Sequence, residues 1–414
     1  MIERLVSQNS IIETPRVVED FQGLAQVVET SNDQLTKRGW ILDQCTLCGD
    51  AYYRKVKGQT ESCNSFVCSG GYDFLNSLGK RNQRSRVTDV VSKFTDIFTN
   101  NGFQIHSPLN ITNAVGNSIF VGNVGQIFDD HIFNSAPVEE HTNKIILQPV
   151  IRFQGQDLVG KVEGFTTSFV NIGSEKLMSN VDEHSKTVDL WMEFMSKVGL
   201  FMGDLALKPK IGQATWGTID GIQTYTLRFN YKGLELGVGN YTLIPQGDRP
   251  TLSQSDLTFG LERILWAVNK NQHFNEVMGP FSYAMRDEDI KMDSYRTTTL
   301  MAGSGVKPGT DEKGSKLRSL VQRFGGVNEE FNPDLVKFYF DWWSQFTNLP
   351  NDIGVTTEIL RAEVGRQRNV QMRSVLIDSG MQIKYPNTQI PTEIFVADLP
   401  DKAYDILRKE LKNK

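Results

Sequence analysis

The stretch Ser255–Trp266, with the sequence SDLTFGLERILW, decides the fold that we expect for this chain. An extended polar run ends at Asp256, Gly260 allows a tight turn, and a helix-forming apolar run opens with Glu262 and Arg263. In the first turn of a helix, free backbone N–H groups and the helix dipole favour an anion. A guanidinium at this point suits a nucleotide phosphate. The alternative is a strand–turn–helix whose Glu262 and Arg263 only face solvent.

The composition of the chain limits its class. It has 414 residues, of which 39% are hydrophobic and 22% are charged, and its formal net charge is −5. These values are typical of a soluble globular protein with roughly two or three domains, and they argue against a general nucleic-acid coat while leaving a local basic face open. No apolar run reaches the ~20 residues that span a bilayer, and the N-terminus lacks the pattern of a signal peptide. We therefore expect a cytoplasmic protein that does not enter a membrane.

All the cysteines of the chain fall in one short window. Cys45 and Cys48 form one close pair, and Cys63 and Cys68 form a second. Two thiolate pairs on turns can converge on a tetrahedral metal ion, and soft thiolate ligands favour zinc over magnesium or calcium. Disulfides are disfavoured in a reducing cytoplasm, and unrelated buried cysteines are the remaining alternative. The window therefore predicts a structural zinc site.

An arginine stands near the end of an apolar strand. Residues 144–153 read as this strand, a polar loop follows over 154–164, and residues 166–172 read as a returning strand, so that the three form a hairpin. Arg152 would be costly on such a strand unless it meets an anion or a carboxylate. A bound anion and a structural ion pair both remain open here.

Further strands and helices surround this hairpin. A helix is expected within 176–200, and strands are expected over 224–231 and 234–243. Gly237 and Gly239 lie inside the last strand, where glycines often mark the close approach of a ligand or of another backbone. Several hairpins with flanking helices predict an antiparallel α+β sheet.

After about residue 270 the pattern becomes helical. Asn332 and Pro333 begin one helix as a cap followed by proline, and we expect its aromatic residues to form a helix core. A helix over about 355–376 carries several arginines, which could bind a phosphate backbone. The alternative is a solvated face balanced by Glu358 and Glu363.

In this order, the residues resemble the signature motifs of class II aminoacyl-tRNA synthetases. A helix and strand end at Pro108, the strand with Arg152 follows, and Gly260–Arg263 comes last. More narrowly, the chain is similar to a truncated alanyl-tRNA synthetase of the archaeal type. Its cysteine window, residues 148–153 and residues 233–235 match motifs of that group. The resemblance implies a class II synthetase-like antiparallel sheet flanked by helices.

The same resemblance divides the chain into three parts. Residues 1–80 would form an N-terminal extension with the zinc-binding segment. Residues 81–270 would form the catalytic domain for ATP and amino acid, and residues 271–414 a helical domain like the one that recognises tRNA.

For the reaction, the resemblance implies that amino acid and ATP give an aminoacyl-adenylate and pyrophosphate, before the acyl group passes to a tRNA or another acceptor. Arg152 would hold the α-phosphate, Arg263 the far end of ATP, and Phe169 would stack on adenine, with Glu235 also at the ATP. Such chemistry depends on cations placed around spreading negative charge. It needs Mg²⁺, held mainly by the phosphates.

For the amino acid, which would be alanine or another small one, the resemblance implies three residues. Asp256 would pair with the α-ammonium group, and Gly237 and Thr258 would border the pocket. Thr258 stands where the family has glycine, so the preference for alanine is not implied. The sequence does not give the oligomeric state.

Two departures from the family lie in the hairpin. The family's Gly-Arg-His appears as Glu163-Gly164-Phe165, and a glutamate of the family is replaced by Val170. These losses favour an alternative in which the chain is a catalytically degenerate paralogue that binds an amino acid, a nucleotide or RNA. The surviving Arg152 and Arg263 favour the ligase.

Overall fold

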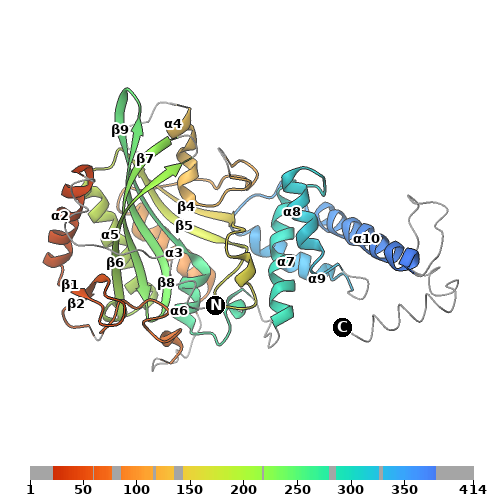
Figure 1. The fold of residues 1–414 in the computed structure, drawn as a ribbon, viewed down its shortest axis with the longest axis horizontal. Coiled ribbons are helices and arrows are strands. Elements are labelled where there is room, and N and C mark those ends of the chain that lie inside the picture. Colours follow the sequence, from red (N-terminus) through yellow and green to blue (C-terminus); the bar gives the residue numbers. More distant parts are fainter. Residues whose placement is uncertain are drawn as a thin grey trace.

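The protein is built on one large mixed sheet with helices beside it (Figure 1). The computed structural model describes residues 22–58, 60–76, 85–114, 118–134, 143–216, 219–278, 286–325 and 330–378. In the described residues, nine strands follow the order β1-β2-β6-β7-β8-β9-β5-β4-β3. All neighbours are antiparallel except β3 and β4, which are parallel. The fold is therefore α+β, as the sequence predicts.

The strands place the hairpins of the sequence side by side. Their bounds are β1 (Trp40–Gln44), β2 (Ala51–Lys55), β3 (Gln104–Ile105), β4 (Lys144–Ile151), β5 (Ser168–Leu177), β6 (Leu205–Trp216), β7 (Ile219–Tyr231), β8 (Leu234–Gln246) and β9 (Arg249–Gly260). The predicted pairs β4–β5 and β7–β8 are confirmed. The helix expected over 176–200 is confirmed as α5 (Val181–Val198), but it begins later than predicted because strand β5 runs on to Leu177. Strand β8 runs through Pro245, and a tight turn at 247–248 joins it to β9.

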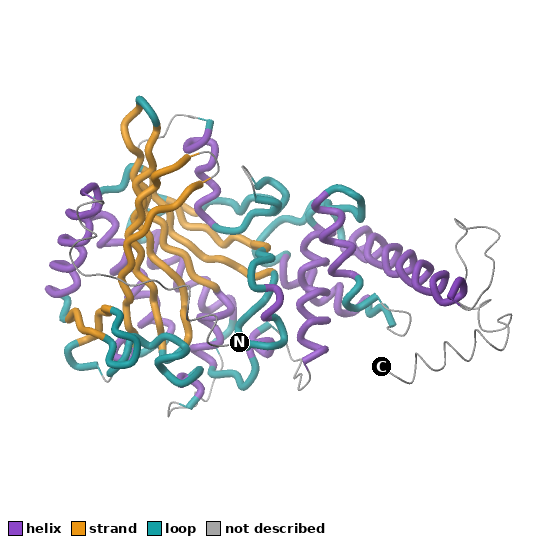
Figure 2. Tube along the Cα trace, viewed as in Figure 1, coloured by secondary structure: helices purple, strands orange, loops and turns teal. Residues whose placement is uncertain are grey.

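Four helices lie beside the sheet and cover one of its faces (Figure 1 and Figure 2): α2 (Gln22–Lys37), α3 (Val87–Thr99), α5 (Val181–Val198) and α6 (Leu261–Asn269). Helix α5 contacts α2 and α3, and both α5 and α6 contact β8 and β9. At the centre of the covered face, the rings of Trp191 and Phe259 stack with centroids 4.0 Å apart. Trp191 also donates a hydrogen bond to the Ser174 hydroxyl at 2.7 Å. Since Phe259 lies on this face, Asp256 and Thr258 point to the opposite face.

The opposite face is partly roofed by one segment. The short helix η3 (Val124–Phe128) lies over β5, and the short helix α4 (Asp129–Phe133) packs against η3. Gly173 on β5 permits this contact, because a Cβ there would lie 2.4 Å from a methyl carbon of Val124. Asn123 caps η3 by accepting a hydrogen bond from the Gln126 amide at 3.2 Å. This roof leaves part of the face open.

Other 3-10 turns join the larger elements of the chain. They are η2 (Asp73–Leu75), η4 (Gln156–Leu158), η5 (Met202–Asp204) and η6 (Phe274–Val277).

The C-terminal part is helical, as predicted. It contains α7 (Arg286–Gly303), α8 (Glu312–Val321), α9 (Pro333–Trp343) and α10 (Ile353–Asp378), and α10 projects away from the sheet (Figure 1). Asn332 caps α9 by accepting hydrogen bonds from the amides of Asp334 and Leu335. The aromatic residues Tyr339, Trp342 and Trp343 are buried, which confirms the predicted helix core.

The arginines of α10 pair mostly within their own helix. Arg361 forms an ion pair with Glu358, and Arg366 forms one with Glu363. Arg361 and Glu358 thus form the balanced, solvated face of the expected alternative, whereas Glu363 is buried, with 2% of its side chain exposed. In the described part of the chain, none of the helices is long and apolar enough to cross a membrane.

Candidate active site and metal centre

Polar side chains form one row across the open face of the sheet. The row follows the pairing of strands, from Lys210 to Thr226, then Asn240, Asp256 and Glu175. Directly paired residues of antiparallel strands point to the same face. A row of this kind on a partly covered sheet is unusual, since core faces are apolar. The face is therefore the strongest candidate for a ligand site.

Hydrogen bonds join the members of this row. Thr226 donates to the Asn240 side-chain oxygen at 2.8 Å, and Asn240 donates to Asp256 Oδ2 at 3.4 Å. On the other side, Gln254 donates to Glu175 Oε2 at 3.1 Å. Burial raises the pKa of Asp256, although hydrogen bonds from Glu175 and Asn240 and the charge of Arg152 oppose this shift.

Arg152 follows the end of β4 and reaches the same face. Its Nε donates to the Gly122 carbonyl at 2.6 Å, and its guanidinium lies 5.2 Å from the centre of the Phe169 ring. Desolvation lowers the pKa of Arg152, the charge of Asp256 raises it, and that of Arg263 lowers it. No described carboxylate pairs with Arg152 within 4.0 Å, so the structural ion pair considered from the sequence is not observed among described residues.

Arg263 lies in the first turn of α6, as predicted. Its two terminal nitrogens donate to the carbonyls of Glu235 at 3.0 Å and Gly164 at 3.3 Å. The ring of Phe165 lies 6.0 Å from its guanidinium. These contacts hold the arginine between β8 and the loop of the β4–β5 hairpin.

Glu262 is buried, with 1% of its side chain exposed. Both of its oxygens accept from the Val170 amide, at 3.0 and 3.1 Å. The alternative in which Glu262 and Arg263 only face solvent is therefore wrong.

The remaining candidate residues are not all on one face. Thr258 is paired with Val238 and lies in phase with Asp256. Gly237 pairs with Phe259, and a Cβ at 237 would lie 2.4 Å from the Phe259 ring and 2.3 Å from the Thr258 carbonyl. The glycine makes room for packing on the helix-covered face, so the structure does not bring it together with Asp256.

Glu235 pairs its carboxylate with Arg228 at 2.9 Å, and it offers Arg263 only its carbonyl. A register shift opposite this part of β8 separates Glu235 from the regular alternation of the strand.

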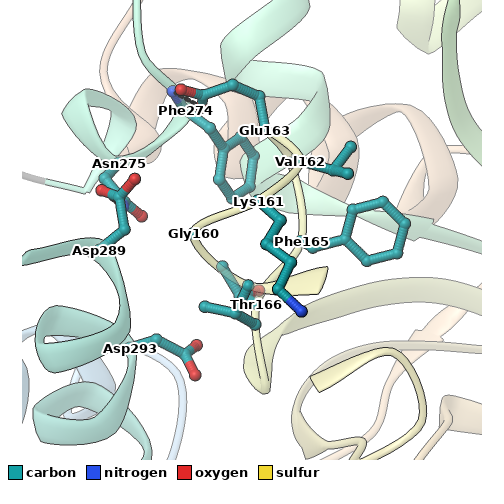
Figure 3. A pocket seen from close by; sticks show the side chains of 12 residues that line it. Gly160, Lys161, Val162, Glu163, Phe165, Thr166, Phe274, Asn275, Asp289 and Asp293 are labelled. Atoms are coloured by element: carbon teal, nitrogen blue, oxygen red, sulfur yellow. Dashed lines mark hydrogen bonds between the residues drawn. The ribbon is translucent and has the colours of Figure 1, made fainter. Parts of the chain in front are cut away.

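A small cavity lies under the loop of the β4–β5 hairpin. Its walls come from residues 159–166 and from Phe274, Asn275, Asp289 and Asp293 (Figure 3). Its volume is about 80 Å³, whereas small-molecule sites are commonly ~300–1,000 Å³. The cavity is too small for a nucleotide, so the sheet face remains the better candidate.

Lysines of α8 approach the site from the helical part. Lys316 lies 4.8 Å from the ring of Phe153, and Lys313 lies 5.9 Å from the ring of Phe120. Phe153 follows Arg152 directly, so these cations border the arginine end of the sheet face.

The cysteines converge as predicted. The Sγ atoms of Cys45, Cys48, Cys63 and Cys68 all lie within 4.8 Å of one another, and those of Cys48 and Cys63 are 3.7 Å apart. Zn–S bonds of ~2.3 Å in a tetrahedron place sulfurs roughly 3.8 Å apart. All four are free thiols, so the disulfide alternative is wrong, as is the alternative of unrelated cysteines. The four could hold a metal such as zinc.

The cysteine segment is fastened to the turn between β7 and β8. Asn230 donates to the Cys63 carbonyl at 2.9 Å, and the Gly233 amide donates to the Asn64 carbonyl at 3.1 Å. A Cβ at Gly233 would lie 1.9 Å from the Gly71 carbonyl oxygen, so the two backbones approach more closely than any side chain would permit.

Tyr72 extends this attachment to the candidate site. Its hydroxyl donates to the Glu163 carbonyl at 2.5 Å, and its ring meets the Trp266 ring edge-on at 4.8 Å. Burial raises the pKa of Tyr72 to about 12. Glu163 precedes the Gly164 carbonyl that receives Arg263, so the cysteine segment supports the loop that orients this arginine.

Sequence reasoning missed Glu175 and Asn240, which complete the polar row, and Gln254, which donates a hydrogen bond to Glu175. Each is a polar residue on the strand face that Asp256 also occupies, and this alternation was the feature of the sequence that could have indicated them. The pairing register that makes the three neighbours was not known from the sequence.

No family model matches the chain, and no curated protein matches it. Among solved structures, the chain has a distant similarity to a class II synthetase. This neighbour is a pyrrolysyl tRNA synthetase of Desulfitobacterium hafniense, with a TM-score of 0.33 and 13% sequence identity over 47% of this chain and 71% of that chain. A likeness this distant assigns neither an activity nor a substrate.

Proposed function

We propose that the chain is an ATP-dependent ligase that forms an aminoacyl-adenylate and passes the aminoacyl group to an acceptor. The observation that carries this proposal is the meeting of Arg152, Asp256 and Arg263, which come from distant segments. Arg152 begins the loop between β4 and β5, Arg263 contacts the Gly164 carbonyl of the same loop, and Asp256 lies on β9 beside β5; the charges of Asp256 and Arg263 both act on Arg152. The reaction needs a carboxylate that binds an ammonium group, which is here Asp256. It also needs cations beside it that bind phosphates, which are here Arg152 and Arg263.

In the proposed reaction, a carboxylate oxygen of the amino acid attacks the α-phosphorus of ATP. The new C–O–P bond forms as the bond to pyrophosphate breaks, and Arg152 stabilises the charge that spreads over the phosphoryl oxygens. Arg263 would bind the far end of ATP. Its present contacts are to carbonyls, which orient the guanidinium without neutralising it.

The adenine would stack on Phe169. Arg152 now lies over this ring, so adenine would compete with the guanidinium or use the other side of the ring. Glu235 would contribute through the carbonyl that holds Arg263. Mg²⁺ would arrive bound to the phosphates and help to neutralise them.

The amino acid would be alanine or another small one. Asp256 would bind its α-ammonium group, and Thr258 would border its side chain. Gly237 would act only through its backbone, since its side-chain position faces Phe259. The acceptor would be the end of a tRNA or another nucleophile, and Lys313 and Lys316 support an anionic one.

We assign zinc to the cysteine site, in a protein of the reducing cytoplasm. The ion would be structural, because four thiolates leave no open position for a substrate. We also keep the three-part division at about residues 80 and 270, with acceptor recognition in the third part.

The glycine at position 164 favours a second function, which is binding without catalysis. Its φ is +80°, and a Cβ there would lie 3.2 Å from the Trp266 ring, so an arginine does not fit at this point of the loop. A synthetase-like chain without this arginine could bind an amino acid, a nucleotide or RNA without catalysis.

Amino-acid-dependent exchange of pyrophosphate into ATP separates the two functions. The ligase predicts exchange with at least one amino acid, and Arg263→Ala should reduce it by about a hundredfold or more. Arg361→Ala, which alters an exposed pair on α10, is the matched control. Full activity of Arg263→Ala would show that the site is misplaced.

A further inference from the structure

Two carboxyl groups face each other on the open face of the sheet. Glu175 on β5 and Asp256 on β9 are direct register partners, and their side chains lie within hydrogen-bonding reach. Glu175 is fully buried, with an exposed fraction of 0%, whereas Asp256 is only partly covered. Asp256 is therefore the member of the pair that a ligand can reach.

Each group has one oxygen that no amide, hydroxyl or amine donor satisfies. These atoms are Glu175 Oε1 and Asp256 Oδ1, both of them buried. Their other oxygens accept from Gln254 and Asn240 respectively. A single proton between the two carboxyl groups satisfies both remaining oxygens, and two bare carboxylates would satisfy neither.

The charges around the pair decide which group keeps the proton. Arg152, at the end of β4, acts on Asp256, and the roof over Glu175 contributes the uncharged Gly125. Lys144 is the β4 register partner of Glu175, but its amino group donates to Gln104 at 2.6 Å. No described cation lies within 4.0 Å of Glu175.

Burial and the neighbouring Asp256 therefore raise the pKa of Glu175 well above its ordinary value. Two adjacent carboxyl groups in a buried site do not both ionise, and the group nearer to a cation and to solvent takes the charge. This arrangement favours the proton on Glu175 and the negative charge on Asp256.

We propose that Glu175 is a positioning residue for amino-acid binding, which holds a proton and donates it in a hydrogen bond to Asp256. This inference rests on the proposed function, because Asp256 is there the partner of the α-ammonium group. The hydrogen bond would fix Oδ1 of Asp256 and leave Oδ2, whose described partner is Asn240 at 3.4 Å, to accept from the ligand. It also limits the pair to one negative charge, which matches one ammonium group.

The protonation is tested without any activity. At neutral pH, the infrared spectrum of the wild type minus that of Glu175→Gln should contain the carbonyl stretch of a protonated carboxylic acid, because the variant has lost this group. Glu358→Gln, at an exposed carboxylate on α10, should leave that band in place. Absence of this band from the difference spectrum would overturn the inference.

The positioning role is tested by exchange kinetics. Glu175→Gln keeps a donor toward Asp256, so the KM for the amino acid should rise less than about threefold. Glu175→Leu removes the donor, so the same KM should rise about tenfold or more while the KM for ATP stays within about twofold. The inference would be overturned if Glu175→Gln and Glu175→Leu raised the KM for the amino acid equally, or if the KM for ATP rose together with that for the amino acid. Either result would indicate a merely structural role.

Failure of the proposed function would look different. If the wild-type chain neither binds nor activates any amino acid, the ligase proposal is removed, and with it the role of Glu175 toward a substrate. A missing carboxylic-acid band in a wild type that does catalyse exchange removes the inference alone.

Discussion

The contact between α6 and α7 gives the sharpest prediction about stability. Glu262 and Arg296 are both 1% exposed and lie 3.5 Å apart. The guanidinium of Arg296 also lies 5.4 Å from the ring of Trp343, whose indole N–H donates to the Arg296 carbonyl at 2.9 Å. Glu262→Ala would leave Arg296 buried without its carboxylate and the Val170 amide without its acceptor.

The size of the effect follows from these two losses. Breaking a buried ion pair costs ~3–5 kcal/mol, and an orphaned amide costs ~1–3 kcal/mol. The two overlap, so we expect Glu262→Ala to lower the free energy of unfolding by about 4 kcal/mol, which is a large part of a typical ~5–15 kcal/mol. Replacing both charges, as in Glu262→Gln with Arg296→Met, should recover much of the loss because no unpaired charge remains.

Urea unfolding followed by circular dichroism measures these differences. Glu358→Ala, which breaks the exposed pair with Arg361, is the matched control and should change stability by less than about 0.5 kcal/mol. A cost below about 1 kcal/mol for Glu262→Ala, or a double variant as unstable as the single one, would refute the reasoning.

Three further predictions concern other parts of the chain. Mass spectrometry of the purified protein should find about one zinc ion per chain. Cys48→Ser should lower the zinc content, and full zinc in this variant would contradict the assignment of the site to the four cysteines. Gly164→Arg should lower the urea midpoint without raising exchange, because the side chain meets Trp266; a gain of activity would show that the loop accepts it. Burial lowers the pKa of His184 to about 4, so the unfolded chain binds a proton at a higher pH than the folded chain does. The free energy of unfolding should therefore fall by roughly 1.4 kcal/mol per pH unit between pH 6.5 and 4. His184→Asn should remove this part of the pH dependence, and an unaltered slope would contradict the prediction.

Local patterns predicted much of the framework. Two strand-like runs around a polar loop predicted the hairpin that carries Arg152, and Gly260 with the apolar run after it predicted the turn into α6. Strand β6 was missed because Pro209 and several polar residues interrupt its pattern. Strands β1 and β2 were missed because each has only five residues beside the cysteine turns.

The candidate site was predictable only in part. Arg152, Asp256 and Arg263 stand in recognisable contexts, and the structure brings them together. Glu175 is far from Asp256 in the chain, and only the pairing of β5 with β9 makes them neighbours. Register is a property of two strands at once, so neither segment alone carries it.

The most direct test of the account is the exchange of labelled pyrophosphate into ATP by the purified full chain, over a panel of amino acids with and without tRNA. We predict exchange with at least one small amino acid, and its loss in Asp256→Asn and in Arg263→Ala. Absence of exchange with every amino acid, from a folded protein that contains its metal, would contradict the ligase and leave the binding module.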